Sequence, residues 1–144
     1  MKANTDLERI GDQAVTIAQV AIKLLEVPTN QPGRDVDPMA NLAHEMLHDD
    51  LVAFVERDVE RALSVLHRDD AADATREAIF RSRLSLMRLE PGTAELGLGL
   101  IFIARCLERI ANHATNIAEE LIFVVQGRDI RHGGTGVFST DSGL

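Results

Sequence analysis

The stretch from Leu100 to Gln126, LIFIARCLERIANHATNIAEELIFVVQ, decides the fold. Its apolar residues recur at alternating steps of three and four, which places them on one face of an α-helix. The residues on this face are Leu100, Ile103, Leu107, Ile110, Ala114, Ile117, Leu121 and Val124. Pro91–Gly92 precedes the stretch and Gly127 follows it. We therefore predict a helix over 93–126, with Gly127 as its C-cap.

Three further segments have helical patterns, over residues 4–26, 39–68 and 70–89. In the first, the predicted buried face contains Leu7, Ile10, Ala14, Ile17, Ala21 and Leu24. A loop rich in Pro and Gly, residues 28–38, separates it from the second. The pair Asp69–Asp70 is expected to cap the third. Long amphipathic helices joined by short loops pack as antiparallel neighbours, so the sequence predicts an all-α, antiparallel, up-and-down helical bundle.

The composition excludes several classes of protein. The 144 residues are enough for one domain, and an aromatic content of 3% disfavours a β-sandwich. A net charge of −8 disfavours binding to nucleic acid, whose phosphates attract basic surfaces. Cys106 is the only cysteine, so it forms no intrachain disulfide or thiolate metal site, and we expect it to be a buried or half-buried apolar residue.

The chain ends suggest no membrane-spanning segment or secretory leader. The N-terminal residues MKANTDLERIGD are charged, and the longest apolar-rich stretch falls short of the roughly 20 residues that a span requires. We therefore expect a cytoplasmic protein that is at most peripheral to a membrane. The C-terminal residues 133–144, GGTGVFSTDSGL, are predicted to be disordered.

An internal repeat relates the two ends of the bundle. The segment LERIGDQAVTIA, residues 7–18, recurs as LERIANHATNIA, residues 107–118, and seven of the twelve positions are identical. Several identities are apolar residues that any bundle reuses, but Glu8 and its equivalent Glu108 lie off the apolar face. The repeated glutamate therefore points to a role outside the core.

Glu8 and Asp12 are one helical turn apart on the predicted outward face. Two carboxylates at this spacing repel each other by a few tenths of a kcal/mol, and a cation that bridges them would offset the repulsion. A solvated face with ordinary ion pairs to Lys2 and Arg9 is the other interpretation of these residues.

The repeat resembles the two characteristic helices of the PhoU family of phosphate-signalling regulators. The resemblance is carried by DLERIGDQA at 6–14, by ARCLERIANHATNIAEELIFVVQGRDIRH at 104–132, and by VLHRDDAADATREAIF at 65–80, which is similar to the acidic helix start of that family. It implies two tandem three-helix bundles, of which this chain has one complete bundle, residues 39–132. Residues 1–27 would be the last helix of a preceding bundle whose first two helices are absent. That helix would then complete a four-helix bundle within the chain or pack in a homodimer.

The resemblance also implies a function and partners. Members of the family are negative regulators of phosphate uptake and of the phosphate-starvation response. They act between the ATPase subunit of a phosphate ABC transporter and a sensor histidine kinase. They bind multinuclear clusters of iron or zinc, and sometimes magnesium or manganese, through acidic motifs on the outer faces of their helices.

Carried over by position, Glu8 and Asp12 match the first metal motif. In the second repeat Glu108 matches, but Asn112 replaces the expected aspartate, which weakens a site for a hard cation. The remaining candidate ligands of the second cluster are Asp58, Asp70 and Asp73. Oxygen ligands alone favour Fe³⁺, Mg²⁺, Mn²⁺ or Ca²⁺ over tetrahedral zinc. We expect Glu8 and Glu108 to face outward and Asp70 and Asp73 to lie near Glu108.

Two other interpretations remain. His44-Glu45-Met46-Leu47-His48 spells HExxH, the helix motif of zinc metalloproteases, so a small zinc hydrolase is an alternative. The motif needs a third ligand, and one ExxH alone is also too few for a ferritin-like di-iron site. A non-functional PhoU remnant is the second alternative.

Overall fold

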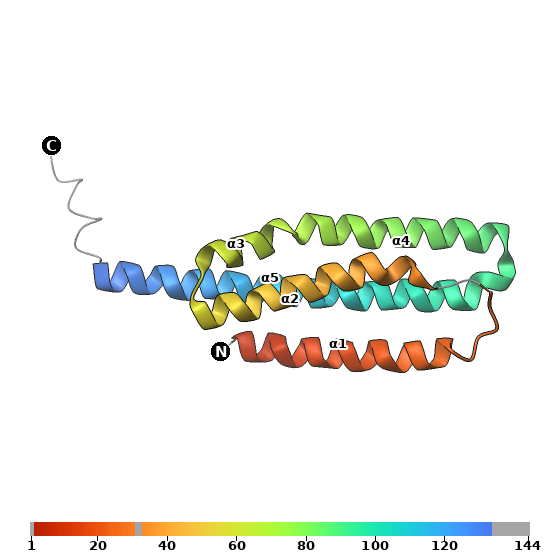
Figure 1. Ribbon diagram of the computed structural model, residues 1–144, viewed down its shortest axis with the longest axis horizontal. Helices are drawn as coiled ribbons and strands as arrows, with labels where there is room; N and C mark the ends of the chain where they lie inside the picture. Colours follow the sequence, from red (N-terminus) through yellow and green to blue (C-terminus); the bar gives the residue numbers. More distant parts are fainter. Residues whose placement is uncertain (1, 31–32, 134–144) are drawn as a thin grey trace.

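The computed structural model describes residues 2–30 and 33–133, with side chains described as far as Gly127. Five α-helices and two short 3₁₀ segments make up this part of the chain. The α-helices are α1 (Lys2–Leu24), α2 (Asp37–Glu56), α3 (Val59–His67), α4 (Asp69–Leu89) and α5 (Ala94–Gly133), and the 3₁₀ segments are η1 (Arg34–Val36) and η2 (Pro91–Thr93). The helices lie side by side along one long axis (Figure 1), which confirms the predicted all-α bundle.

Helix α5 is the centre of the bundle, and α1, α2, α3 and α4 all contact it. Seven of its eight predicted core residues are buried, and Val124 is half-buried. The helix continues past Gly127 to Gly133, so the predicted C-cap is wrong. No described glycine has a positive φ, and Gly127 therefore keeps helical geometry where a cap would need the left-handed region.

The predicted second helix, 39–68, is two helices. Arg57 has φ 54° and ψ 40°, the left-handed conformation that ends α2. Asp58 is then extended, and its Oδ1 accepts a hydrogen bond of 3.0 Å from the backbone N–H of Arg61, which starts α3. A cap of this kind stabilises a helix start by about 1 kcal/mol. The apolar periodicity continues across this break, so the sequence pattern did not predict that the segment is two helices.

The predicted cap at Asp69–Asp70 is also wrong. Helix α4 begins at Asp69, the residue before it is Arg68, and no side chain caps the helix start. Both aspartates therefore lie inside the first turn. Negative charge is favourable there because the first turn of a helix exposes backbone N–H groups.

Helix α1 packs along α5 in the antiparallel direction (Figure 1), so the first helix completes the bundle within the chain. The predicted buried face was partly wrong, because Leu7, Ala14 and Ala21 are exposed. The face that packs inward is rotated by about one residue from the predicted face. Its residues are Ala3, Asp6, Ile10, Ile17, Val20 and Leu24. The Asp6 carboxylate, which is buried, lies 2.8 Å from His113 Nδ1 of α5 and accepts a hydrogen bond from Asn116.

Close helix contacts explain the small residues at the start of α5. A Cβ at Gly99 would lie 2.5 Å from Cδ2 of Leu24, and one at Gly97 would lie 2.8 Å from Sδ of Met87. These two glycines therefore allow α5 to approach α1 and α4 closely. Cys106 is buried as expected, and burial raises the pKa of its thiol.

A buried ion pair fastens the loop before α2 to α4. Arg83 is 5% exposed, and its Nε and Nη2 donate to the two carboxylate oxygens of Asp35 over 2.6 and 2.5 Å. The predicted loop 28–38 therefore contains η1 and already includes the first residues of α2. The predicted disordered tail lies outside the described residues, apart from Gly133, which ends α5. Within the described part, no helix is long and apolar enough to cross a membrane.

Candidate metal centre

Three aspartates at the start of α4 form the only group of three or more acidic, His or Cys side chains within metal-binding reach among the described residues. They are Asp69, Asp70 and Asp73, and one carboxylate oxygen of each lies within 4.8 Å of the others. Asp69 is half-buried, whereas Asp70 and Asp73 are exposed. The backbone positions them, because Asp73 lies four residues after Asp69 and three after Asp70, and residues three or four apart lie on the same face of a helix.

The surroundings of Asp69 disfavour its charged form. Burial raises its pKa, and so do the negative charges of Asp73, Asp70, Glu108 and Glu119. Its Oδ1 is buried and has no hydrogen-bond partner. A half-buried carboxylate surrounded by four others, with an unpaired oxygen, is a position where a bound cation would relieve repulsion.

Glu108 lies close to the group but is engaged in an ion pair. Its Oε2 accepts a hydrogen bond from Nε of Arg76 on α4, and the Glu108 side chain is 21% exposed. The expected proximity of the α4 aspartates to Glu108 is supported by its effect on the pKa of Asp69. The Glu108 side chain is half-buried, whereas we expected it to face outward. A metal would have to compete with Arg76 for its carboxylate.

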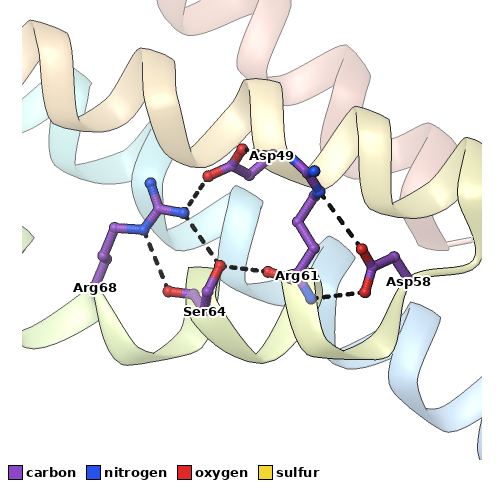
Figure 2. A network of polar contacts seen from close by, with 5 residues as sticks. All are labelled: Asp49, Asp58, Arg61, Ser64 and Arg68. Atoms are coloured by element: carbon purple, nitrogen blue, oxygen red, sulfur yellow. Dashed lines mark hydrogen bonds and ion pairs between the residues drawn. The ribbon is translucent and has the colours of Figure 1, made fainter.

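The junction of α2, α3 and α4 fixes where the aspartates lie. Figure 2 shows that Asp49 of α2 is held by two guanidinium groups, those of Arg61 and Arg68. Arg68 also donates to the carbonyl of Ser64 over 3.2 Å. The hydrogen bond from Arg68 lowers the pKa of Asp49, which keeps that carboxylate charged. Since Arg68 immediately precedes Asp69, this network anchors the start of α4.

Asp58 belongs to the same network and is outside the acidic group. Its carboxylate caps α3 and lies 3.6 Å from Nε of Arg61 (Figure 2). The structure therefore gives Asp58 a helix-capping role. It is absent from the one group of candidate ligands in the described part of the chain.

Glu8, Asp12 and Asn112 are exposed, and the outward placement of Glu8 agrees with the expectation. Glu8 and Asp12 lie on α1, and within the described residues no third His, Cys or acidic side chain joins them in a group. The structure therefore brings Asp70 and Asp73 together with Asp69, and within the part of the chain that it describes it adds no third ligand to the first motif.

Asp69 and Glu119 are the residues that sequence reasoning missed at the centre. Asp69 was considered only as a helix cap. It stands four residues before Asp73, the same spacing that drew attention to Glu8 and Asp12, so this signal was present. Glu119 lies on another helix from the aspartates, and only the packing of α4 on α5 brings its charge near them.

The HExxH residues lie on the exposed face of α2. His44, Glu45 and His48 line a cavity of about 300 Å³ together with Asp49 and Arg68. Besides Glu45, the carboxylate in this lining is Asp49, and two arginines already hold it. Among the described residues, no third ligand accompanies the two histidines. The geometry therefore favours the α4 aspartates over the HExxH motif.

The chain is similar to a known family of proteins. A family model described as PhoU domain matches residues 36–121. A protein of Caulobacter vibrioides named phosphate-specific transport system accessory protein PhoU homolog is 38% identical over 131 residues, which are 90% of this chain and 57% of that protein.

Solved structures give the same result. The crystal structure of PhoU from Pseudomonas aeruginosa superposes with a TM-score of 0.83 at 36% identity, covering 88% of this chain and 61% of that one. A phosphate transport system regulatory protein PhoU from Streptococcus pneumoniae gives a TM-score of 0.78 at 30% identity, covering 88% and 60%. This chain thus spans about three-fifths of the length of the relatives that it matches.

Proposed function

This chain belongs to the PhoU family, and we propose that it is a negative regulator of phosphate uptake and phosphate-starvation signalling. The single observation that carries the proposal is the match of the family model across α2 to α5, the same helices that build the candidate metal centre. Relatives named as accessory proteins of phosphate transport, at 38% identity, support a role at such a transporter.

The proposed partners are the ATPase subunit of a phosphate ABC transporter and a sensor histidine kinase, with the chain acting as an adaptor between them. An adaptor needs charged surface more than a catalytic cavity, and the acidic side chains at the start of α4 supply such a surface. We further propose, by resemblance to the family, that the chain forms a homodimer.

The proposed metal is held by Asp69, Asp70 and Asp73, with Glu108 as a further ligand when Arg76 releases it. The donor set is made of carboxylate oxygens, which suits Fe³⁺, Mg²⁺, Mn²⁺ or Ca²⁺. The unpaired Oδ1 of Asp69 fits this role, because a cation would give the buried oxygen the partner it lacks. When bound, the cation would cancel local negative charge and create a surface that attracts phosphate or an acidic partner segment.

The second proposed centre, at Glu8 and Asp12, has two carboxylates only. We expect it to bind metal more weakly than the aspartates of α4, because affinity for a hard cation grows with the number of charged ligands. Asn112 contributes at most a neutral oxygen. Zinc remains a candidate for either centre by resemblance to the family alone.

Metal analysis tests the proposed centre. The full 144-residue chain, purified without chelator, is analysed for iron, zinc, manganese and magnesium and then titrated with Mn²⁺. The double variant Asp69→Ala/Asp73→Ala should bind Mn²⁺ at least tenfold more weakly, and the control Glu95→Ala, an exposed acid at the other end of α5, should match wild type. Equal metal content and affinity in all three proteins would contradict the proposed centre.

A reporter experiment tests the regulatory role. The chain is expressed in a bacterium that lacks its own PhoU protein and carries a reporter of phosphate-starvation genes. Restored repression in high phosphate, together with co-purification of the transporter ATPase subunit, is the expected result. Neither repression nor capture would favour a non-functional remnant. Metal binding without repression would support the metal centre and contradict the regulatory role.

A further inference from the structure

The two histidines of the HExxH motif have no role in the proposed function. His44 and His48 lie four residues apart on α2, and both side chains are exposed. Residues at this spacing lie on one face of a helix, so both imidazoles can reach the same ion. Among the described residues, neither histidine has a hydrogen-bond or ion-pair partner, in contrast to His113, which contacts Asp6. Both imidazoles are therefore available to a ligand.

Glu45 gives this group the same spacing as the candidate metal centre of α4. His44, Glu45 and His48 occupy the first, second and fifth positions of a five-residue stretch, as the three aspartates of α4 do. On α4 this spacing brings one oxygen of each side chain within 4.8 Å of the others. The three side chains of α2 do not lie that close together in the described part of the chain. Exposed side chains change rotamer within nanoseconds, so an ion that binds one of them can gather the others.

The donor atoms of the two groups differ. The group on α4 offers carboxylate oxygens alone, which suit hard cations. The group on α2 offers two imidazole nitrogens and one carboxylate, and imidazole suits Ni²⁺, Cu²⁺ and Zn²⁺. The affinity of such nitrogen ligands rises from Mn²⁺ to Cu²⁺ along the first transition series. We therefore expect the two groups to select different classes of metal.

A cavity beside the motif provides space and charge for a cation. It measures about 300 Å³, and its lining consists of His44, Glu45, His48, Asp49 and Arg68. Asp49 and Arg68 form an ion pair with each other, so their charges compensate. Glu45 then gives the lining a net negative charge while the histidines are neutral, which favours a cation over an anion.

We propose that His44 and His48, assisted by Glu45, bind a divalent transition metal of the Ni²⁺, Cu²⁺ and Zn²⁺ class on α2, apart from the carboxylate centre of α4. Two imidazole nitrogens hold the ion, and water completes its coordination. The site binds metal without hydrolytic chemistry, since catalytic zinc sites use three protein ligands and a water. The inference is independent of the regulatory role and of the metal at α4, because it uses only donor atoms of α2.

Titration of the full, tag-free chain with Ni²⁺ tests the site. Wild type should bind Ni²⁺ with an affinity on the order of micromolar, and His44→Asn/His48→Asn should weaken this binding by about tenfold or more. His67→Asn is the matched control, because His67 is exposed at the end of α3 and has no histidine four residues away. Circular dichroism confirms that each variant folds. A wild type without this binding, or a double variant with unchanged affinity, would overturn the proposal.

Crossed titrations with two metals separate this site from the centre of α4. Asp69→Ala/Asp73→Ala should retain the Ni²⁺ affinity of wild type, and His44→Asn/His48→Asn should retain its Mn²⁺ affinity. Loss of Ni²⁺ binding in the aspartate variant alone would assign both metals to α4 and overturn the proposal.

Nuclear magnetic resonance locates the bound ion. Paramagnetic Ni²⁺ should broaden the ring-proton signals of His44 and His48 at substoichiometric amounts and leave those of His67 sharp. Equal broadening of all three histidines would show unspecific contact and overturn the site.

Discussion

Helices α1 and α5 carry the same repeated sequence but occupy different surroundings. In α5 the apolar residues are buried among four helices, whereas α1 packs on α5 with one face and leaves Leu7, Ala14 and Ala18 exposed. The two acidic motifs differ in the same way. Glu108 is half-buried against Arg76, and Glu8 is exposed on the surface of α1. The sequence pattern therefore specifies which face of a helix can pack against others. The neighbouring helices decide whether that face is covered.

The equivalent isoleucines of the two repeats should differ most in their contribution to stability. Ile117 is 2% exposed, and Ile117→Ala should lower the free energy of unfolding by about 2–5 kcal/mol. Ile17 is half-buried at the edge of the core, so Ile17→Ala should cost roughly half as much. Urea denaturation of both variants measures the difference. Equal losses would mean that α1 is as enclosed as α5.

A buried acid on the enclosed side of the bundle should make stability depend on pH. Asp50 of α2 is 1% exposed, and burial, with a contribution from the charge of Asp49, raises its pKa from 3.8 to about 8. The folded chain therefore holds a proton that the unfolded chain has released. The contribution of Asp50 to stability is complete below about pH 4 and is lost as the pH rises towards 8.

Replacing this acid should remove its share of the pH dependence. Asp50→Asn should be more stable than wild type by about 2–4 kcal/mol at pH 8, with little difference at pH 4. Asp49→Asn is the matched control with the opposite sign, because the ion pairs of Asp49 with Arg61 and Arg68 require its charge. Urea titrations at both pH values provide the test. A parallel pH dependence of wild type and Asp50→Asn would show that this side chain reaches water.

Equivalent alanines should respond oppositely to a larger side chain. Ala114 is fully buried, and Ala114→Leu should destabilise the fold by about 1–3 kcal/mol through overpacking. Ala14 is exposed, so Ala14→Leu should change stability by less than about 0.5 kcal/mol. Thermal unfolding at low protein concentration, where association is weak, separates the two. A large loss for Ala14→Leu would indicate that this face of α1 is already covered within one chain.

The smallest expected effect compares the two acidic motifs without metal. Asp12→Asn removes an exposed repulsion with Glu8 and should raise the free energy of unfolding by a few tenths of a kcal/mol. Asp69→Asn should raise it more, since burial and four neighbouring carboxylates raise the pKa of Asp69. Both are measured in chelator. Addition of Mn²⁺ should then stabilise wild type more than Asp69→Asn, and equal stabilisation would show that Asp69 is not a metal ligand.

The sequence predicted the type of each element better than its ends. Apolar periodicity identified the central helix and its core, because steps of three and four leave a strong signal over many turns. The break at Arg57 was not predicted, because a left-handed residue between two apolar stretches leaves the period of the apolar residues intact. The rotation of the buried face of α1 was not predicted either. Its two adjacent faces are both apolar, and only contact with α5 selects the one that is buried.

The candidate metal centre was predictable in part. Asp70 and Asp73 followed from resemblance and spacing, and Asp69 could have been found by the same four-residue spacing. The influence of Glu119, the ion pair of Glu108 with Arg76 and the capping role of Asp58 could not. Each depends on a contact between residues on different helices or on a local break in the backbone.

The sequence by itself determined an α-helical bundle, a repeated helix with outward acidic residues, and a resemblance to PhoU, because these are properties of spacing along one chain. The tertiary structure decided which apolar face of α1 is buried, which acids of α5 act on the aspartates of α4, and which acids are bound by arginine. Those outcomes depend on distances between helices, and no periodicity within one helix encodes them.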